Sequence, residues 1–341
     1  MTQNHIEELV NNILATIERE REREIVSRRY GLFDRKETLE QIGELLGITR
    51  ERVRQLEKSV MSRLRANAEA GDLPGLTEFE QQLIAKLKEV GNIARVLNLN
   101  KELTGENGTK IEQSRLAFIA ELSPQLVVVS DNDHYFQAVA ITDIHDEKKI
   151  QKHVTGIIEA IKKIGEPTTI HEVSKKISHD DPDHVHALST TSKHLATLNG
   201  KWGLIKWPTV NPKNIRDKIY VILQQHGKHM HFNEIADAIK DSDFKRKDVT
   251  TQAIHNELIK DKRFVLIGRG IYALKEWGYA KGTVADIITD VLAEANQPLH
   301  RDEIVKRVLK SRYVKETTIL LNLQGKEQFK RVAKATYSLA K

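Results

Sequence analysis

The sequence predicts a mainly α-helical protein, with an N-terminal helix-turn-helix followed by tandem winged-helix modules, which are helical units with short β-hairpin wings. Three observations predict this fold class. Proline and aromatic residues are scarce, with 7 Pro and 5% aromatic residues, and stretches rich in Lys and Glu favour helix over sheet. Residues 38–65 contain two apolar helical patterns joined by a glycine. The C-terminal half repeats one pattern of helices and strands three times.

Composition narrows the class of protein. The chain has 341 residues, which is enough for more than one hydrophobic core. Its net charge of +6 permits a polyanionic partner but does not require one. The absence of cysteine excludes disulfides, thiol catalysis and Cys-ligated metal sites, and it is typical of a reducing compartment. Since no apolar run reaches 18 residues, we expect a soluble, cytoplasmic protein that does not associate with membranes.

The two helices between residues 38 and 65 carry their own start and stop signals. Thr38, with Gln41 three residues later, predicts a capping box at the start of the first helix. Gly47 can take the left-handed conformation that ends it, and Thr49 can cap the second helix. In the second helix, the predicted buried stripe consists of Val53, Leu56, Val60 and Leu64. The opposite, polar face consists of Arg50, Glu51, Arg54, Gln55 and Lys58.

Two short helices joined by a tight glycine turn have the geometry that enters a DNA major groove. The residue types on the polar face suit that role, because Arg can bind guanine bidentately, Glu can accept from cytosine and Gln can pair with adenine. An ordinary solvated helix with ion pairs between successive turns has the same pattern. The pattern alone leaves both interpretations open.

Residues 21–65 closely resemble region four of sigma-70-class factors. The matching pieces are the arginine-rich lead-in, the turn at residues 29–32, the helix that starts at Thr38, and residues 49–57. In that family the second helix reads the promoter −35 element. The resemblance implies that Arg50, Glu51, Arg54 and Gln55 face bases, and that Arg52, Lys58 and Arg63 contact phosphates. It also implies that Ile13–Leu32 contacts the flap of the RNA polymerase core.

The position of the motif departs from the family pattern. In a full sigma factor region four comes last, whereas here it stands first. No aromatic-rich block of the kind that melts the −10 element is found in the rest of the chain. We therefore expect that this protein does not initiate transcription alone.

The C-terminal half contains a repeat. Segments that start at Gly165, Gly227 and Asn296 each follow an apolar helix pattern and reach a glutamate before a second helix. The middle copy ends in Phe264–Leu274, which reads as two strands around a Gly-Arg-Gly turn. Three helices followed by such a hairpin predict a winged helix. The predicted division of the chain is 1–70, 76–146, 150–210, 213–279 and 281–341.

Residues Ile215–Trp277 resemble the HARE-HTH domain, a family that includes the N-terminal domain of the delta subunit of Gram-positive RNA polymerase. The resemblance lies in the block 231–235 and in the end of the copy, 263–274. Arg269 in the predicted wing is placed to contact a phosphate backbone. Other basic residues in the wings and near the third helices are Lys193, His194, Lys245, Arg246, Lys247 and Lys334. Winged helices also serve as protein-docking platforms, so either role stays open for each copy.

Residues 76–146 are less regular. We expect helices at Glu78–Leu97 and Glu112–Leu122, then a hairpin over Leu126–Ile141 that turns at Asp131–Asp133. This order suggests a fourth, diverged winged module.

A group of histidines and aspartates at His179–His186 raises the question of a metal site. Because Asp181-Pro182-Asp183 is typical of a turn, we interpret the segment as an exposed linker between two helices. We interpret His229, His231 and His300 as residues at the start of helices. The chain contains no phosphate-binding glycine loop, nucleophile elbow or H-E-x-x-H motif, so we expect neither an enzyme nor a cofactor.

Together these observations predict a sequence-specific DNA-binding transcription protein. Its partners would be double-stranded DNA and the RNA polymerase core, with the winged modules adding DNA or polymerase contacts. One alternative is a chromosome-organising protein that binds DNA without polymerase. Another is an interaction scaffold that binds no DNA.

Overall fold

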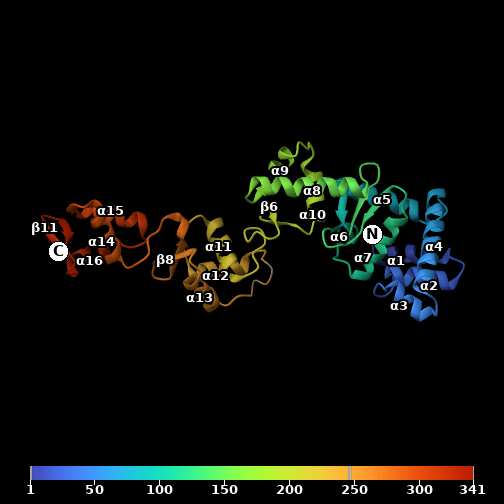
Figure 1. The fold of residues 1–341 in the computed structure, drawn as a ribbon, viewed down its shortest axis with the longest axis horizontal. Coiled ribbons are helices and arrows are strands. Elements are labelled where there is room, and N and C mark those ends of the chain that lie inside the picture. The colour runs from blue at the N-terminus through green and yellow to red at the C-terminus, as the bar shows by residue number, and fades with distance from the viewer. Residues whose placement is uncertain (1, 245, 247, 341) are drawn as a thin grey trace. The chain divides into compact units, whose positions relative to one another are not determined.

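The computed structural model describes residues 2–244, 246 and 248–340 (Figure 1). The chain divides into two compact units, Met1–Lys206 and Trp207–Lys341. Lys245 and Lys247, two of the basic residues singled out near the third helices, lie outside the described residues. No helix in the part that the structure describes is long and apolar enough to cross a membrane.

Four helices open the first unit. They are α1 (Gln3–Ala15), α2 (Glu20–Tyr30), α3 (Leu39–Leu46) and α4 (Arg50–Ala70). The remaining elements repeat the order helix, strand, helix, helix, strand, strand, and within the described residues this order occurs four times. In each repeat the three strands form an antiparallel sheet, and the last strand of the repeat lies in the middle.

The first two repeats belong to the first unit. The first repeat consists of α5 (Leu76–Glu89), β1 (Ile93–Arg95), α6 (Val96–Thr104), α7 (Lys110–Leu122), β2 (Leu126–Val129) and β3 (Ala138–Ile141). The second repeat consists of α8 (Glu147–Ile164), β4 (Thr168–Thr169), α9 (Ile170–Lys176), α10 (Pro182–Thr191), β5 (Leu195–Leu198) and β6 (Lys201–Leu204).

The last two repeats make up most of the second unit. The third repeat consists of α11 (Ile215–His226), β7 (Met230–His231), α12 (Phe232–Asp241), α13 (Thr251–Lys260), β8 (Phe264–Gly268) and β9 (Ile271–Leu274), with a 3-10 turn, η1 (Lys275–Trp277), after it. The fourth repeat consists of α14 (Val284–Ala295), β10 (Leu299–His300), α15 (Arg301–Ser311), α16 (Glu316–Gly325), β11 (Phe329–Ala333) and β12 (Thr336–Leu339).

The repeated glutamate closes a capping box at the start of the second helix in the second and third repeats, whereas Glu303 in the fourth repeat pairs with Arg307 instead. In the third repeat the His231 imidazole Nδ1 accepts a hydrogen bond from the Asn233 N–H, and the Glu234 carboxylate accepts one from the His231 N–H. The His300 imidazole accepts from the Asp302 N–H in the same way. The prediction that His231 and His300 begin helices is confirmed. His229 instead packs against a tyrosine ring, with its centroid 4.5 Å from that of Tyr313.

The predicted hairpins form, and in the third and fourth repeats a residue with positive φ makes the turn. Phe264 pairs with Leu274 across β8 and β9, which confirms the two strands around Gly268-Arg269-Gly270. The fourth repeat has no glycine at its turn. Ala335 takes the positive φ there, at 56°, a conformation that is strained for a residue with a Cβ.

Two expectations about local structure are wrong. The helix predicted over Glu78–Leu97 ends at Glu89, because Gly91 and Asn92 have φ of 95° and 67° and the following strand β1 pairs with β3. The segment His179–His186 is not an exposed linker throughout. Asp181 caps α10 by accepting from the backbone N–H of Asp183 and His184, and His184 is 4% exposed.

One hydrophobic core joins the opening helices to the first repeat. Ile6, Val10 and Ile13 on α1 lie in the same buried cluster as Leu116 and Phe118 on α7. The cluster also includes buried residues of α4, α5 and β3. This core therefore joins α1, α2 and α4 to the first repeat.

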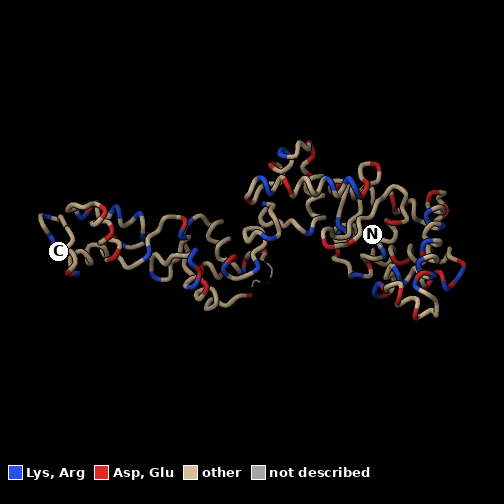
Figure 2. The backbone as a smooth tube through the Cα atoms, in the orientation of Figure 1, with Lys and Arg blue, Asp and Glu red and all other residues tan. Residues whose placement is uncertain are grey.

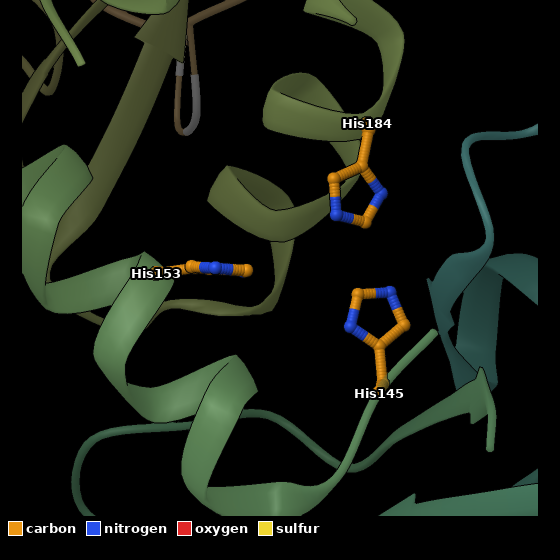
Figure 3. Close-up of side chains that lie close together, drawn as sticks. All are labelled: His145, His153 and His184. Carbon is orange, nitrogen blue, oxygen red and sulfur yellow. The ribbon is translucent and has the colours of Figure 1, made fainter. Parts of the chain in front are cut away.

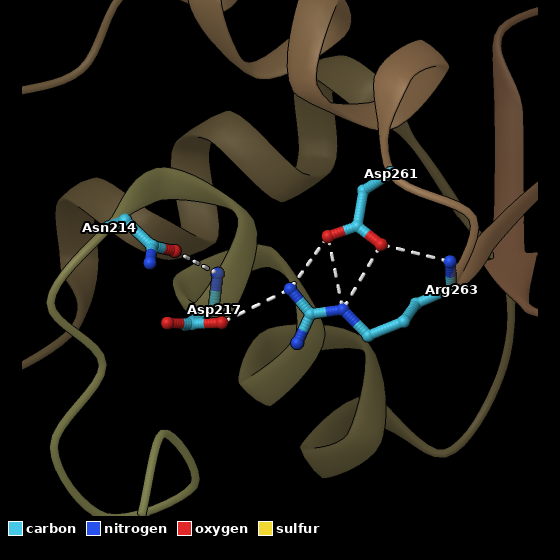
Figure 4. A network of polar contacts seen from close by, with 4 residues as sticks. All are labelled: Asn214, Asp217, Asp261 and Arg263. Carbon is cyan, nitrogen blue, oxygen red and sulfur yellow. Dashed lines mark hydrogen bonds and ion pairs between the residues drawn. The ribbon is translucent and has the colours of Figure 1, made fainter. Parts of the chain in front are cut away.

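An ion pair between buried Asp217 and partly exposed Arg263 holds the third repeat together (Figure 4). Asp217 on α11 is 8% exposed, and its carboxylate lies 3.1 Å from the Arg263 guanidinium. Arg263 also bonds Asp261 at 2.7 Å, and this contact lowers the pKa of the Asp261 carboxyl. Asn214 caps α11 by accepting from the Asp217 N–H. Arg263 thus links the first helix of the repeat to the loop before β8.

Replacing Arg263 with glutamine should destabilise the second unit at pH 7 by about 2 kcal/mol, because a buried carboxylate loses its charged donor. The Asp261 carboxyl, whose pKa Arg263 lowers in the folded chain, contributes stability at pH values above its unfolded pKa. This contribution is lost as the pH falls through the pKa that Asp261 has in the folded chain. The difference between wild type and variant should therefore shrink below about pH 4. Denaturant unfolding across pH measures this. Arg269→Gln, an exposed change in the same repeat, serves as the control, and a pH-independent difference would contradict the assignment.

Candidate nucleic-acid interface

The turn between α3 and α4 is built by the predicted caps. The Thr38 hydroxyl accepts from the Gln41 N–H at 3.3 Å, and the Gln41 side chain accepts from the Thr38 N–H at 2.9 Å. Gly47 ends α3 with φ 64°, and Thr49 caps α4 by accepting from the Arg52 N–H. The capping box, the left-handed glycine and the second cap are confirmed. They set α4 at a fixed angle to α3, as a helix-turn-helix requires.

Gly43 is the tightest point of this turn. A Cβ at this position would lie 2.7 Å from the Ile48 carbonyl oxygen, which is backbone and cannot move aside cheaply. The Gly43 carbonyl in turn accepts from the Ile48 N–H at 2.9 Å. Only a residue without a Cβ allows α3 and the turn to approach this closely.

Replacing Gly43 with alanine should therefore push α3 from the turn and cost about 1–3 kcal/mol, in the range of an overpacked site. Thermal unfolding and DNA binding should both report the change. Gly47→Asn is the matched control. Its φ is positive but nothing lies within 4 Å of a Cβ there, and Asn tolerates that conformation. Equal unfolding temperatures for the two variants would contradict the close-approach argument.

A small core holds α2, α3 and α4 together. Ile25, Ile42 and Val53 are fully buried against one another. Farther along α4, Val60 and Leu64 are buried in the core shared with the first repeat. Leu56 is partly buried against the small core. The predicted apolar stripe is therefore buried at Val53, Val60 and Leu64, and α4 continues to Ala70.

The polar face of α4 is open to solvent. All seven residues assigned to DNA contact in this segment are exposed: Arg50, Glu51, Arg52, Arg54, Gln55, Lys58 and Arg63. One turn of helix brings several of them together. The Arg54 guanidinium donates two hydrogen bonds to the Glu51 carboxylate, at 2.8 and 2.7 Å, and Arg52 bonds the Gln55 amide at 3.3 Å.

The charges of this face differ in how firmly they are paired. The hydrogen bond from Arg54 lowers the pKa of the Glu51 carboxyl, which keeps it an acceptor. The Arg50 guanidinium lies 2.8 Å from Glu40 on α3. Solvent screens both contacts, so a DNA base or phosphate can replace them at small cost. Lys58 has no ion-pair partner among the described residues. Its ammonium group can therefore meet a phosphate without first breaking an ion pair.

Arg63 differs from its neighbours. It forms an ion pair with Glu22 on α2, a carboxylate that is 6% exposed and that also contacts Arg19. Arg63 thus neutralises a buried acid and joins α2 to α4. Local sequence patterns do not predict Glu22 as its partner, because the two residues are 41 positions apart in the chain and do not belong to one motif.

The apolar side chains of the segment Ile13–Leu32 pack mostly inside the protein. Ile13, Val26 and Leu32 belong to the core shared with α7, and Arg115 on α7 donates to the Leu32 carbonyl oxygen at 2.7 Å. Tyr30 packs edge-on against Phe118, with centroids 5.1 Å apart. Beside this packed face a groove remains open. It is lined by Glu20, Arg23, Glu24, Ser27, Phe33 and Arg35, among other residues.

Basic residues outside the helix-turn-helix are spread along the chain. Figure 2 shows Lys and Arg interspersed with Asp and Glu on every repeat rather than gathered on one. Arg269 stands exposed in the turn between β8 and β9. Lys193 and His194 are engaged with the first repeat, Lys193 in an ion pair with Asp131 and His194 in a hydrogen bond with His134.

This arrangement is that of a helix-turn-helix, and comparison with known proteins shows which class of protein the segment resembles. Residues 19–66 match the family profile "Sigma-70, region 4". The chain is 42% identical over 66 residues to the RNA polymerase sigma factor SigA of Microcystis aeruginosa and to that of Synechocystis sp.. It has the same identity over the same length to the RNA polymerase sigma factor SigA1 of Synechococcus elongatus.

These similarities are local. Each covers 19% of this chain and 15% or 16% of the relative. The resemblance to region four is thus confirmed for the N-terminal segment.

Proposed function

We propose that this chain is a sequence-specific DNA-binding transcription protein that acts with RNA polymerase. The observation that carries the proposal is the first turns of α4. There a segment similar to sigma-70 region four presents Arg50, Glu51, Arg54 and Gln55 to solvent, on a helix whose other face is buried. Side chains of this kind at the start of a second helix can reach base edges in a major groove. In the proposal α4 reads a −35-like promoter element.

Phosphate contacts flank the base-reading face in this proposal. Lys58 and Arg52 lie on the exposed surface of α4, where backbone contacts fix the register of a helix on DNA without reading its sequence. Arg63 contributes less, because it already neutralises the Glu22 carboxylate. The N-terminal module therefore binds chiefly through the first half of α4.

The four repeats act as winged-helix modules in this proposal, and the third as a HARE-HTH-like module. Their support is the order of three helices and a hairpin, with the hairpin as the wing. Arg269, at the tip of the third repeat, is placed to meet a phosphate. Several weak contacts on one chain strengthen one another, because the second binding event becomes intramolecular. The proposal assigns the chain no catalytic step.

A polymerase contact would use the open groove beside α2 rather than the apolar face, which α7 covers. Glu20 and Phe33 both line this groove, and Phe33 is 44% exposed. Deleting residues 1–70 would expose the core of the first repeat, so point variants test the contact more cleanly.

Co-purification separates this function from that of a chromosome-organising protein. The tagged full-length chain should retain core RNA polymerase from a lysate treated with nuclease, and the double variant Glu20→Lys, Phe33→Ser should retain much less. Arg54→Ala should retain as much as wild type, because it faces DNA. Duplex binding without any polymerase would favour the chromosome-organising alternative. If the chain bound no duplex even at low salt, only the interaction-scaffold alternative would remain.

A further inference from the structure

Three histidines from three elements of the first unit converge on one point (Figure 3). His145 lies in the segment between β3 and α8, His153 on α8 and His184 on α10. One ring nitrogen of each lies within 4.8 Å of the others. His145 and His184 are 1% and 4% exposed, while His153 belongs to the exposed residues although its ring points toward the other two.

The hydrogen bond of His184 determines which of its nitrogens is free. Its Nδ1 lies 2.7 Å from the Gly91 carbonyl oxygen, which can only accept, so Nδ1 carries the proton. The Nε2 lone pair is then available as a ligand. A ring N–H held by a backbone carbonyl is the usual second contact of a metal-binding histidine, because it fixes the tautomer and the ring orientation.

The His145 ring is buried and stacks on the His184 ring, with their centroids 4.8 Å apart. Neither of its ring nitrogens has a hydrogen-bond partner among the described residues, although both are shielded from solvent. Such groups are rare in native proteins, since an unpaired buried polar atom costs free energy.

The nearby carboxylates are otherwise engaged. Asp146 caps α8 by accepting from the Lys149 N–H at 2.7 Å, and Asp181 caps α10. The cluster thus offers imidazole nitrogens rather than the oxygens that magnesium and calcium need.

We propose that His145, His153 and His184 bind one divalent transition-metal ion of the zinc class, with a fourth position open to water. A zinc–nitrogen bond of about 2.0–2.1 Å puts tetrahedral ligand atoms about 3.4 Å apart. Side-chain rotations that bring the nitrogens up to about 1.4 Å closer complete the site, and exposed His153 gives the ion a path in.

The bound ion would fasten the first repeat to the second. Gly91 lies just before β1, and a Cβ there would lie 2.6 Å from the Asp183 carbonyl oxygen at the start of α10. This close approach places the Gly91 carbonyl against His184. A metal on His184, His153 and His145 would lock α10 and α8 to the end of β3.

The test uses the full-length chain without a polyhistidine tag, stripped with a chelator and dialysed. Titration calorimetry should give one Zn²⁺ per chain, and Co²⁺ should give visible d–d absorption of a four- or five-coordinate site. His153→Gln should weaken Zn²⁺ binding at least about tenfold, the scale of losing a supporting contact alone. His171→Gln, an exposed histidine on α9 outside the cluster, should bind as wild type does.

Because His153 is exposed, its variant should fold even if variants of buried His145 and His184 do not. Unchanged Zn²⁺ affinity in His153→Gln would overturn the proposal. So would a wild-type dissociation constant weaker than about 100 µM, which corresponds to a binding free energy too small for a built site.

Discussion

Replacing Arg54 with alanine should reduce the preference of the chain for its favoured duplex, relative to an unrelated duplex, by about tenfold to a hundredfold. Arg54 is exposed on the first half of α4, and its guanidinium is already aligned by the Glu51 carboxylate. A planar guanidinium on a rigid helix can bind a guanine with two hydrogen bonds, and alanine can make neither. Competition binding at fixed salt measures the ratio.

Lys58→Ala is the matched contrast on the same helix. It should weaken both duplexes alike and lower the slope of log affinity against log salt by about one, because one phosphate contact is lost. The preference for the favoured duplex should stay at its wild-type value. If Arg54→Ala and Lys58→Ala behaved identically, the division of α4 into base-reading and phosphate-contacting residues would be wrong.

Phe118→Ala should destabilise the first unit by about 3–5 kcal/mol, the usual cost of deleting a large aromatic side chain from a core. Phe118 is fully buried on α7 and packs edge-on against Tyr30 in the sigma-like segment. Since the core around it joins α1 and α4 to the first repeat, the substitution should unfold these parts together. Thermal unfolding followed by circular dichroism measures the shift.

Phe33→Ala provides the control, because Phe33 is 44% exposed and lies outside that core. It should leave the unfolding temperature nearly unchanged. A Phe118→Ala chain that still binds its favoured duplex while the first repeat is unfolded would show that the helix-turn-helix is stable alone. That result would contradict the shared core.

Local signals predicted the helix-turn-helix because each of its features lies within a few residues. Thr38, Gln41, Gly47 and Thr49 act on neighbouring backbone groups, so their pattern alone specifies the turn. The Gly-Arg-Gly hairpin of the third repeat was predictable for the same reason. The exposure of Arg54 and Lys58 followed from helical periodicity.

The features that sequence reasoning missed depend on contacts between distant residues. The pairing of Arg63 with Glu22 and the convergence of His145, His153 and His184 arise only when the helices pack. The end of α5 at Glu89 was also missed, because residues 93–95 read as a continuing helix until β3 is present to pair with them. The apolar side chains of Ile93 and Ala94 suit either structure.

The most direct test of a base-reading α4 is selection of duplexes from a random pool by the full-length chain. The wild type should enrich one family of related sequences, and Arg54→Ala should lose that enrichment at the position that Arg54 contacts while still retaining duplexes at low salt. A wild-type selection that enriches no sequence, with Arg50, Glu51, Arg54 and Gln55 intact, would contradict sequence-specific binding by this helix.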